Sequence, residues 1–368
     1  MDIFTTYLLV ILAVSIGLGF FAQAGRFCLA GGLREAFSSQ GSSRLWAYFA
    51  AIAIALIGVS VIEYMQFVSL DETKPSYRSD QFAYGRYILG GLIFGFGMIL
   101  ASGCGMRNLI KSGQGNYKGI IMVFFMALAA YVMTKTSVYA DVFLPIVTPF
   151  TLDLSSFGHQ DLGSLITHAF MPDSMDRLEW IRLVISLAIA AVILFFAFKN
   201  KTFRQPRYFV SSIAVGAAIV AGYYITGSDM AHTLSEEAEF MEIPPLGLGM
   251  QSYSFAAPMA DTIYSAMNPV GLSVITFGVV AVIGLPIGSL IASLVRKEFK
   301  IEGFTSSKDF VISIVGALLA GTGAVLAMGC SVGHGLTGIA TLAIGSFLAL
   351  TSIVAGAYIG LKVEARIK

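Results

Sequence analysis

The chain has 368 residues, of which 56% are hydrophobic and only 12% are charged, and its formal net charge is +1. A soluble globular domain has about 25% charged residues, so this composition excludes a soluble protein. The small net charge gives no reason to expect a nucleic-acid partner. The chain has three cysteines, an odd number, and each lies in or beside apolar sequence, which argues against a disulfide framework.

Taken in chain order, about nine apolar stretches have the length that crosses a bilayer, which needs roughly 20 residues. These stretches are residues 7–24, 46–67, 87–102, 118–136, 180–198, 208–226, 270–295, 310–327 and 339–361. The pattern predicts an all-α integral membrane protein that forms one membrane domain over residues 1–368, in contact with the lipid bilayer.

The segment after the first span, residues 25–44, differs from an ordinary loop. Its centre, FCLAGGL, is too apolar for a water-exposed loop and too short to cross the membrane. Non-helical backbone is tolerated at membrane depth only where it is packed in protein or lines a cavity. We therefore expect a re-entrant segment of non-helical backbone here.

The charged connectors predict the orientation of the chain. Residues 139–176 and 229–261 contain acidic residues and no Lys or Arg, whereas residues 199–207, 296–309 and the C-terminal tail are basic or lean basic. Basic loops stay in the cytoplasm. We therefore expect the N-terminus outside and the C-terminus in the cytoplasm.

One stretch occurs twice. Residues 90–104 (GGLIFGFGMILASGC) align without gaps on residues 316–330 (GALLAGTGAVLAMGC) at an offset of 226, with eight identities in fifteen positions. Each copy is an apolar helix that stops at Gly-Cys. A broken helix repeated in corresponding halves of a membrane protein is a pointer to a transporter's binding site.

The predicted topology gives the two copies opposite directions across the membrane, so we expect an inverted-topology repeat. One half would cover residues 7–139 and the other residues 208–361, with residues 180–198 as a linking helix. Glycines inside the repeat allow close helix approach, and we prefer this packing role to ligand contact. These glycines are Gly95, Gly97, Gly321 and Gly323.

The candidate site residues lie at these breaks. Cys104 and Cys330 end the two repeat copies, Cys28 lies in the re-entrant segment, and the same offset places Ser254 opposite Cys28. A thiol is a weak donor and a soft acceptor, which suits an anion with a terminal sulfur or selenium. Backbone N–H groups freed at the breaks, near Gly103 and Gly329, would stabilise such an anion.

Further polar residues have two open interpretations. Asn108 and His334 occupy matching positions, four residues after the repeat cysteines, and either line the path or are satisfied polar residues in the bundle. Arg107 either adds positive charge to the path or anchors a helix end at the cytoplasmic face. Glu63 is expected to be interfacial. Cys330 and His334 have a possible metal-ligand spacing, but no Cys-x₂-Cys pair supports a closed site, so no metal or other cofactor is expected.

Three motifs resemble those of a known family. The stretches RFCLAGGLREA around Cys28, LASGCGMRNLIKSGQGNYKG around Cys104 and LAMGCSVGHGLTG around Cys330 are similar to the cysteine motifs of the YeeE/YedE family. Its members are bacterial inner-membrane proteins associated with uptake of sulfur compounds, in particular thiosulfate. The resemblance implies an hourglass-shaped bundle of inverted repeats with short helices entering from both faces.

The resemblance also implies a mechanism. The three cysteines would line a constricted route and relay thiosulfate by transient S–H···S hydrogen bonds, and a small TusA-like sulfurtransferase would dock at the cytoplasmic face. On this basis we expect a transporter and not an enzyme. The alternatives are a transporter of a selenium or other sulfur species, a membrane sulfur-transfer enzyme that uses a cysteine persulfide, and a structural subunit.

Overall fold

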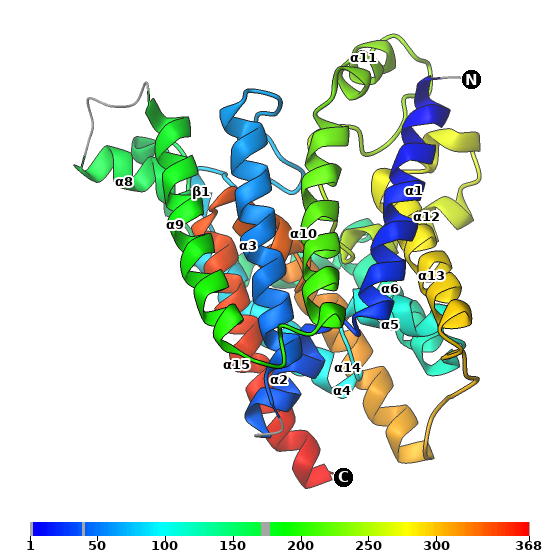
Figure 1. Cartoon of the computed structure of the whole chain (residues 1–368). Helices are drawn as coiled ribbons and strands as arrows, with labels where there is room; N and C mark the ends of the chain where they lie inside the picture. The colour runs from blue at the N-terminus through cyan, green and yellow to red at the C-terminus, as the bar shows by residue number, and fades with distance from the viewer. Residues whose placement is uncertain (1–2, 39–40, 171–176, 368) are drawn as a thin grey trace.

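The computed structural model describes residues 3–38, 41–170 and 177–367. Nine helices in these ranges are long and apolar enough to cross a membrane. They are α1 (Ile3–Ala24), α3 (Ser43–Tyr64), α4 (Tyr84–Leu100), α6 (Tyr117–Lys135), α9 (Leu178–Lys199), α10 (Pro206–Thr226), α13 (Phe277–Val295), α14 (Ser307–Leu326) and α15 (Ile344–Ile367). The predicted all-α membrane fold is confirmed (Figure 1).

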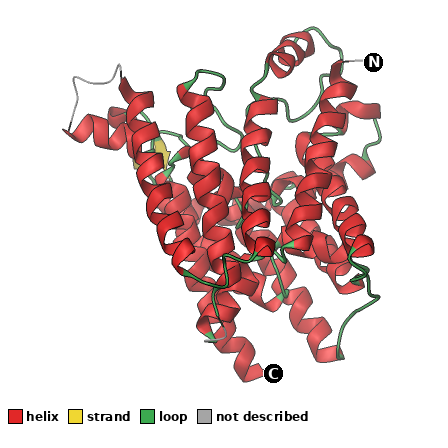
Figure 2. Ribbon diagram, in the orientation of Figure 1, coloured by secondary structure: helices red, strands yellow, loops and turns green. Residues whose placement is uncertain are grey.

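Shorter elements join these helices. The short α-helices are α2 (Leu29–Phe37), α5 (Gly105–Gly113), α7 (Leu144–Val147), α8 (Leu162–Phe170), α11 (Asp229–Ala238) and α12 (Ala257–Met267). Short 3₁₀ or π turns occupy η1 (Tyr139–Phe143), η2 (Thr148–Phe150), η3 (Ser155–Phe157), η5 (Gly271–Val274), η6 (Gly333–Gly338) and η7 (Ile339–Thr341). Two-residue strands β1 (Gln81–Phe82) and β2 (Leu152–Asp153) pair antiparallel, with Gln81 opposite Asp153 (Figure 2).

The structure corrects the expectation of non-helical backbone in residues 25–44. These residues contain the helix α2, because the Cys28 thiol accepts a hydrogen bond from Gly31 N at 3.2 Å and caps its first turn. A glycine in this helix allows close packing. A Cβ at Gly32 would lie 2.7 Å from Leu45 N, so glycine lets α2 approach the start of α3.

Several span boundaries also differ, and two spans start later in the chain than expected. The seventh span starts at Phe277 and not at residue 270, and the ninth starts at Ile344 and not at residue 339. The chain before each start forms a 3₁₀ turn, which composition alone does not separate from helix. The connector of residues 139–176 contains the helix α8, and its Asp173 and Asp176 lie outside the described residues.

The two predicted halves pack against each other. α4 packs on α14 and α15, α1 packs on α13, and α6 packs on α14. A Cβ at Gly97 would lie 2.6 Å from Gly316 O, and a Cβ at Gly323 would lie 2.8 Å from Gly90 O. Because the offset of 226 converts one of these contacts into the other, the two repeat helices meet through reciprocal glycine contacts.

The other two repeat glycines also pack closely. A Cβ at Gly95 would lie 2.0 Å from Ile353 O, and a Cβ at Gly321 would lie 2.4 Å from Met126 O. The packing role expected for the repeat glycines is therefore confirmed.

The charged segments gather at opposite ends of the bundle. Figure 1 shows α8, α11 and the N-terminus at one end, and the C-terminus and α2 at the other. The two acidic connectors therefore lie at the end of the bundle that holds the N-terminus.

Candidate functional site

Each cysteine follows a helix that ends in the same way. The N–H of Phe27, Gly103 and Gly329 bonds the carbonyl five residues earlier, at 2.8 to 2.9 Å. The residue before each of these donors is left-handed although it is not glycine. These residues are Arg26 (φ 53°), Ser102 (φ 60°) and Met328 (φ 67°). This is the Schellman pattern of helix termination, and it turns the chain sharply just before each cysteine.

The chain coils again directly after each turn. The carbonyls of Cys28, Cys104 and Cys330 accept hydrogen bonds from the N–H groups four residues later, at 2.8 to 3.0 Å. Cys28 and Cys104 are the N-cap residues of α2 and α5, and Cys330 precedes the π-helical segment η6. The cysteines thus lie where free backbone N–H groups and the helix dipole favour negative charge.

The three cysteines come from distant parts of the sequence and meet in the core. All are free thiols, with 7%, 4% and 2% of their surface exposed for Cys28, Cys104 and Cys330. All three belong to the same cluster of buried core residues. The Tyr48 hydroxyl donates to Ser331 O and interacts with both Cys104 and Cys330. The structure therefore brings the three predicted residues together.

A cavity lies near the break at Cys330. It has a volume of about 380 Å³, and Ser254, Lys74, Gln251 and Thr276 are among its lining residues. We call it the Ser254 cavity. A void of about 10 Å³ beside Cys330, lined also by Gly105 and Phe255, shares Ala256 and Ala324 with this cavity. The predicted Ser254 thus lines a cavity that shares two lining residues with the small void beside Cys330.

His334 is a satisfied polar residue of its break, whereas Asn108 is satisfied only through Nδ2, because its buried Oδ1 has no hydrogen-bond partner among the described residues. Asn108 Nδ2 donates to Gly103 O and Cys104 O at 2.9 and 3.2 Å. His334 pairs through Nε2 with Ala327 O at 2.6 Å and through Nδ1 with Ser346 Oγ at 3.1 Å. Both ring nitrogens of His334 are occupied, which leaves neither free to ligate a metal.

Gly103 and Gly329 make room for the side chains that follow the breaks. A Cβ at Gly103 would lie 2.9 Å from Arg107 Cγ, and a Cβ at Gly329 would lie 2.8 Å from His334 Cδ2. The two glycines therefore let side chains of the next turn fold back over the break.

Arg107 lies beside the cysteines nearer the C-terminal end of the bundle. It interacts electrostatically with Cys28 and Cys104, and its Nη1 has no hydrogen-bond partner among the described residues although it is buried. The neighbouring arginines are paired: Arg44 with Glu35 at 3.0 Å and Arg26 with Glu298 at 3.7 Å. Arg107 thus offers a cation with donor capacity to spare next to two thiols.

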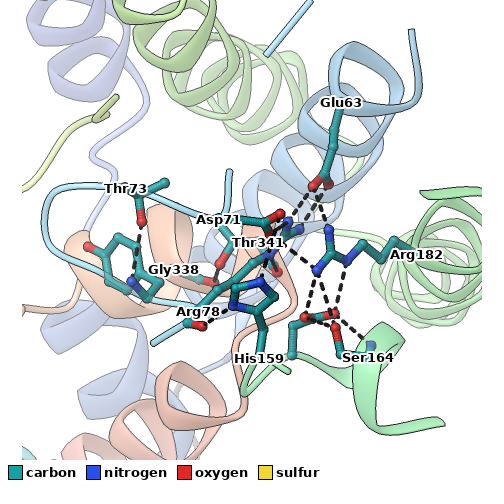
Figure 3. Close-up of polar contacts among 11 residues, drawn as sticks. Glu63, Asp71, Thr73, Arg78, His159, Ser164, Arg182, Gly338 and Thr341 are labelled. Atoms are coloured by element: carbon teal, nitrogen blue, oxygen red, sulfur yellow. Dashed lines mark hydrogen bonds and ion pairs between the residues drawn. The ribbon is translucent and has the colours of Figure 1, made fainter. Parts of the chain in front are cut away.

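Sequence reasoning missed a buried ionic network, shown in Figure 3. Glu63 was expected at the interface, but it is buried and pairs with Arg78 and Arg182, of which Arg78 is 1% exposed. Arg182 also bonds Asp161 at 2.9 Å, and Arg78 also contacts Asp71 at 3.1 Å. A signal was present, because Glu63 and Arg182 both lie within apolar spans, where ionised groups need partners.

The network reaches the segment that follows Cys330. Arg78 Nε donates to Thr341 O in η7 at 2.9 Å, and His159 Nδ1 lies 3.0 Å from Arg78 O (Figure 3). Through Arg78, the network fixes the turn between η6 and α15.

Fold and site together define a polytopic α-helical membrane protein with three buried thiols at helix breaks. A family model described as sulphur transport matches residues 24–359. The chain therefore belongs to this sulphur-transport family, YeeE/YedE, as its cysteine motifs suggested.

Two relatives carry the same name, "Thiosulfate transporter TsuA". The one from Escherichia coli (strain K12) is 25% identical over 356 residues, which cover 93% of this chain and 90% of the relative. The one from Spirochaeta thermophila is 30% identical over 275 residues, which cover 73% of this chain and 74% of the relative. This chain is similar to both over most of its length.

Proposed function

We propose that this protein takes up thiosulfate, or a closely related soft sulfur anion, through a route lined by Cys330, Cys104 and Cys28. The observation that carries the proposal is that the three motif cysteines, each at a helix break, belong to one buried cluster in the core. Family membership and the names of two relatives support sulfur-anion transport.

In this route the anion enters the Ser254 cavity and reaches Cys330 first. Each thiol donates a weak S–H bond to the terminal sulfur of the anion, and that sulfur moves to the next thiol without a covalent step. Free N–H groups at the starts of α2 and α5 favour the charge on the way. Arg107, with its unpartnered Nη1, receives the anion beside Cys28.

The orientation of the chain follows from its charged connectors. We propose that the acidic end with the N-terminus faces outward and that the C-terminal end faces the cytoplasm of a bacterium, across its inner membrane. The matching breaks at Cys104 and Cys330 and the reciprocal glycine contacts of α4 and α14 support an inverted repeat. A TusA-like sulfurtransferase at the cytoplasmic end would accept the arriving sulfur.

The first prediction tests the relay with labelled thiosulfate in proteoliposomes. We expect Cys104→Ala to reduce uptake at least about 100-fold, because it removes the middle thiol, and we expect Cys104→Ser to fail similarly, since a hard hydroxyl donor pairs poorly with a soft terminal sulfur. Ser60→Ala is the matched control, because its buried hydroxyl bonds only its own helix, to Leu56 O and Ile57 O. Wild-type uptake by folded Cys104→Ser would refute the soft-thiol relay.

Mass spectrometry separates the transporter from a sulfur-transfer enzyme. In the enzyme, a cysteine thiolate would attack the terminal sulfur of thiosulfate, form a persulfide and release sulfite. We expect all three cysteines to keep the mass of the free thiol after uptake. A persulfide on any of them during turnover would favour the enzyme.

A further inference from the structure

A group of buried tyrosines surrounds the segment after Cys330, and one hydroxyl differs from the rest. Four of the hydroxyls have partners: Tyr48 with Ser331 O, Tyr223 with Thr337 O at 3.3 Å, Tyr87 with Gln160 Nε2 at 3.4 Å and Tyr253 with Ser15 Oγ at 3.0 Å. The hydroxyl of Tyr77, a residue only 3% exposed, has no hydrogen-bond partner in the described part of the chain. Buried polar groups almost always have a hydrogen-bond partner, so the unpaired Tyr77 hydroxyl indicates a position where a ligand can bind.

The ring of Tyr77 is held firmly. Its backbone N–H donates to Thr73 Oγ1 at 3.2 Å, and its ring meets the His334 ring edge-on at 5.9 Å between centroids. A Cβ at Gly338 would lie 2.9 Å from the Tyr77 ring. Because His334 is itself fixed through both ring nitrogens, the Tyr77 hydroxyl has a defined position.

A second hydroxyl without a partner lies beside it. A Cβ at Gly333 would be 3.3 Å from the Tyr77 hydroxyl and 2.8 Å from Ser254 Oγ, so the two hydroxyls flank the same glycine. Ser254 makes no hydrogen bond through its side chain among the residues described, and it lines the Ser254 cavity. Gly333 leaves the space between the two hydroxyls free of side-chain atoms.

The chemistry of Tyr77 suits donation to an anion. Burial, with Tyr223, Cys330 and Tyr87 nearby, holds the pKa of Tyr77 well above its usual value, so the hydroxyl stays protonated at neutral pH. The Tyr77 ring also contacts His334, whose backbone N–H donates to Cys330 O at 2.8 Å. Two hydroxyl donors thus lie next to Gly333, three residues after Cys330, and one of them lines the Ser254 cavity.

We propose that the Tyr77 and Ser254 hydroxyls bind the oxygen end of a sulfur oxyanion while its terminal sulfur faces Cys330. Thiosulfate has two chemically different ends, and hard donors with a soft thiol would orient it sulfur first. This inference rests on the proposed function, because the two hydroxyls would select the anion that enters the route lined by the cysteines. Tyr77 is then a specificity-determining residue.

The second prediction concerns Tyr77→Phe, which removes only the hydroxyl. We expect the KM for thiosulfate uptake to rise roughly tenfold with a smaller change in Vmax, because one hydrogen bond to a charged ligand is lost. We also expect an unchanged or higher Tm, since an unpaired buried hydroxyl has been removed. The matched control is Tyr223→Phe, for which we expect a lower Tm, because Thr337 O loses its donor, and a wild-type KM.

Binding to the purified protein tests the proposal independently of transport. Isothermal titration calorimetry measures the affinity for sulfate, which has oxygens but no terminal sulfur, and for thiosulfate. We expect Tyr77→Phe to weaken the binding of both anions, and Cys330→Ala to weaken the binding of thiosulfate alone. Wild-type affinities in Tyr77→Phe would overturn the inference. Weakened binding in Tyr77→Phe, together with no thiosulfate uptake by the wild type, would uphold the anion site and refute the proposed transport.

Discussion

At the scale of the residue, small side chains decide how closely the helices meet. A Cβ at Gly97 would lie 2.5 Å from Ala320 N and 2.6 Å from Gly316 O, both backbone atoms of α14 that cannot move alone. In contrast, a Cβ at Gly17 on α1 would meet nothing within 4 Å. The two glycines thus form a natural pair of test and control.

The third prediction is that Gly97→Ala destabilises the protein by about 1–3 kcal/mol, because the added methyl forces α4 and α14 apart. Gly17→Ala should leave stability unchanged or raise it slightly, because alanine favours helix over glycine. Thermal unfolding in detergent measures both. Equal Tm values for the two variants would show that the α4–α14 contact tolerates the methyl group.

The cysteines could be predicted from the sequence, whereas Tyr77 could not. Each cysteine is marked locally by an apolar run that ends in glycine-rich sequence, so a short window suffices. Tyr77 is distinguished from Tyr48 and Tyr223 only by which hydroxyls find partners, and those partners lie far away in the chain. The proposed anion-binding role of Tyr77 can be inferred only from the structure, in which Ser254 and Gly333 lie beside it.

At the scale of the element, the ionic network joins parts that the sequence keeps apart. Asp161 lies in a connector that looked purely acidic, yet it pairs with Arg182 on α9. Burial raises the pKa of Asp161, but the charges of Arg78 and Arg182 outweigh burial and hold it below the ordinary value of 3.8. A lowered pKa means that ionised Asp161 stabilises the fold above the unfolded pKa, and that this contribution is lost as pH falls through the folded one.

The fourth prediction follows from that sign. Asp161→Asn should lower the Tm at pH 7, and the difference from wild type should shrink as the pH falls below about 4. Asp229→Asn, at the exposed start of α11, is the control and should change the Tm little at either pH. A difference that stays constant down to pH 3 would mean that the charge of Asp161 contributes nothing.

The sequence predicts which stretches form the membrane-spanning helices, but it predicts the ends of these helices less well. The nine spans follow from hydropathy. A long apolar stretch in lipid must pair its own backbone N–H and C=O groups, and an α-helix does this within the segment. The resemblance implied short helices of the kind of α2, whereas the local sequence predicted non-helical backbone there; the Cys28 cap and contact with α3 support the helix. The network around Glu63 depends on long-range pairing, which composition cannot show.

At the scale of the whole molecule, the fifth prediction addresses orientation. Thr233 on α11 and Lys201 in the basic loop are both exposed, and the native cysteines are buried. We expect Thr233→Cys to react with a membrane-impermeant thiol reagent on intact cells, and Lys201→Cys to react only after permeabilisation, because basic loops stay inside. The reverse pattern would invert the proposed topology.

The narrow point beside Cys330 has a consequence for the cell. A void of about 10 Å³ holds at most about one water molecule, so an unbroken water file cannot form there. Protons hop along such files, and an open file would short-circuit the electrical potential on which bacterial energy conversion depends. In the proposed setting, a bacterial inner membrane could therefore hold many copies of this protein and keep its electrical potential.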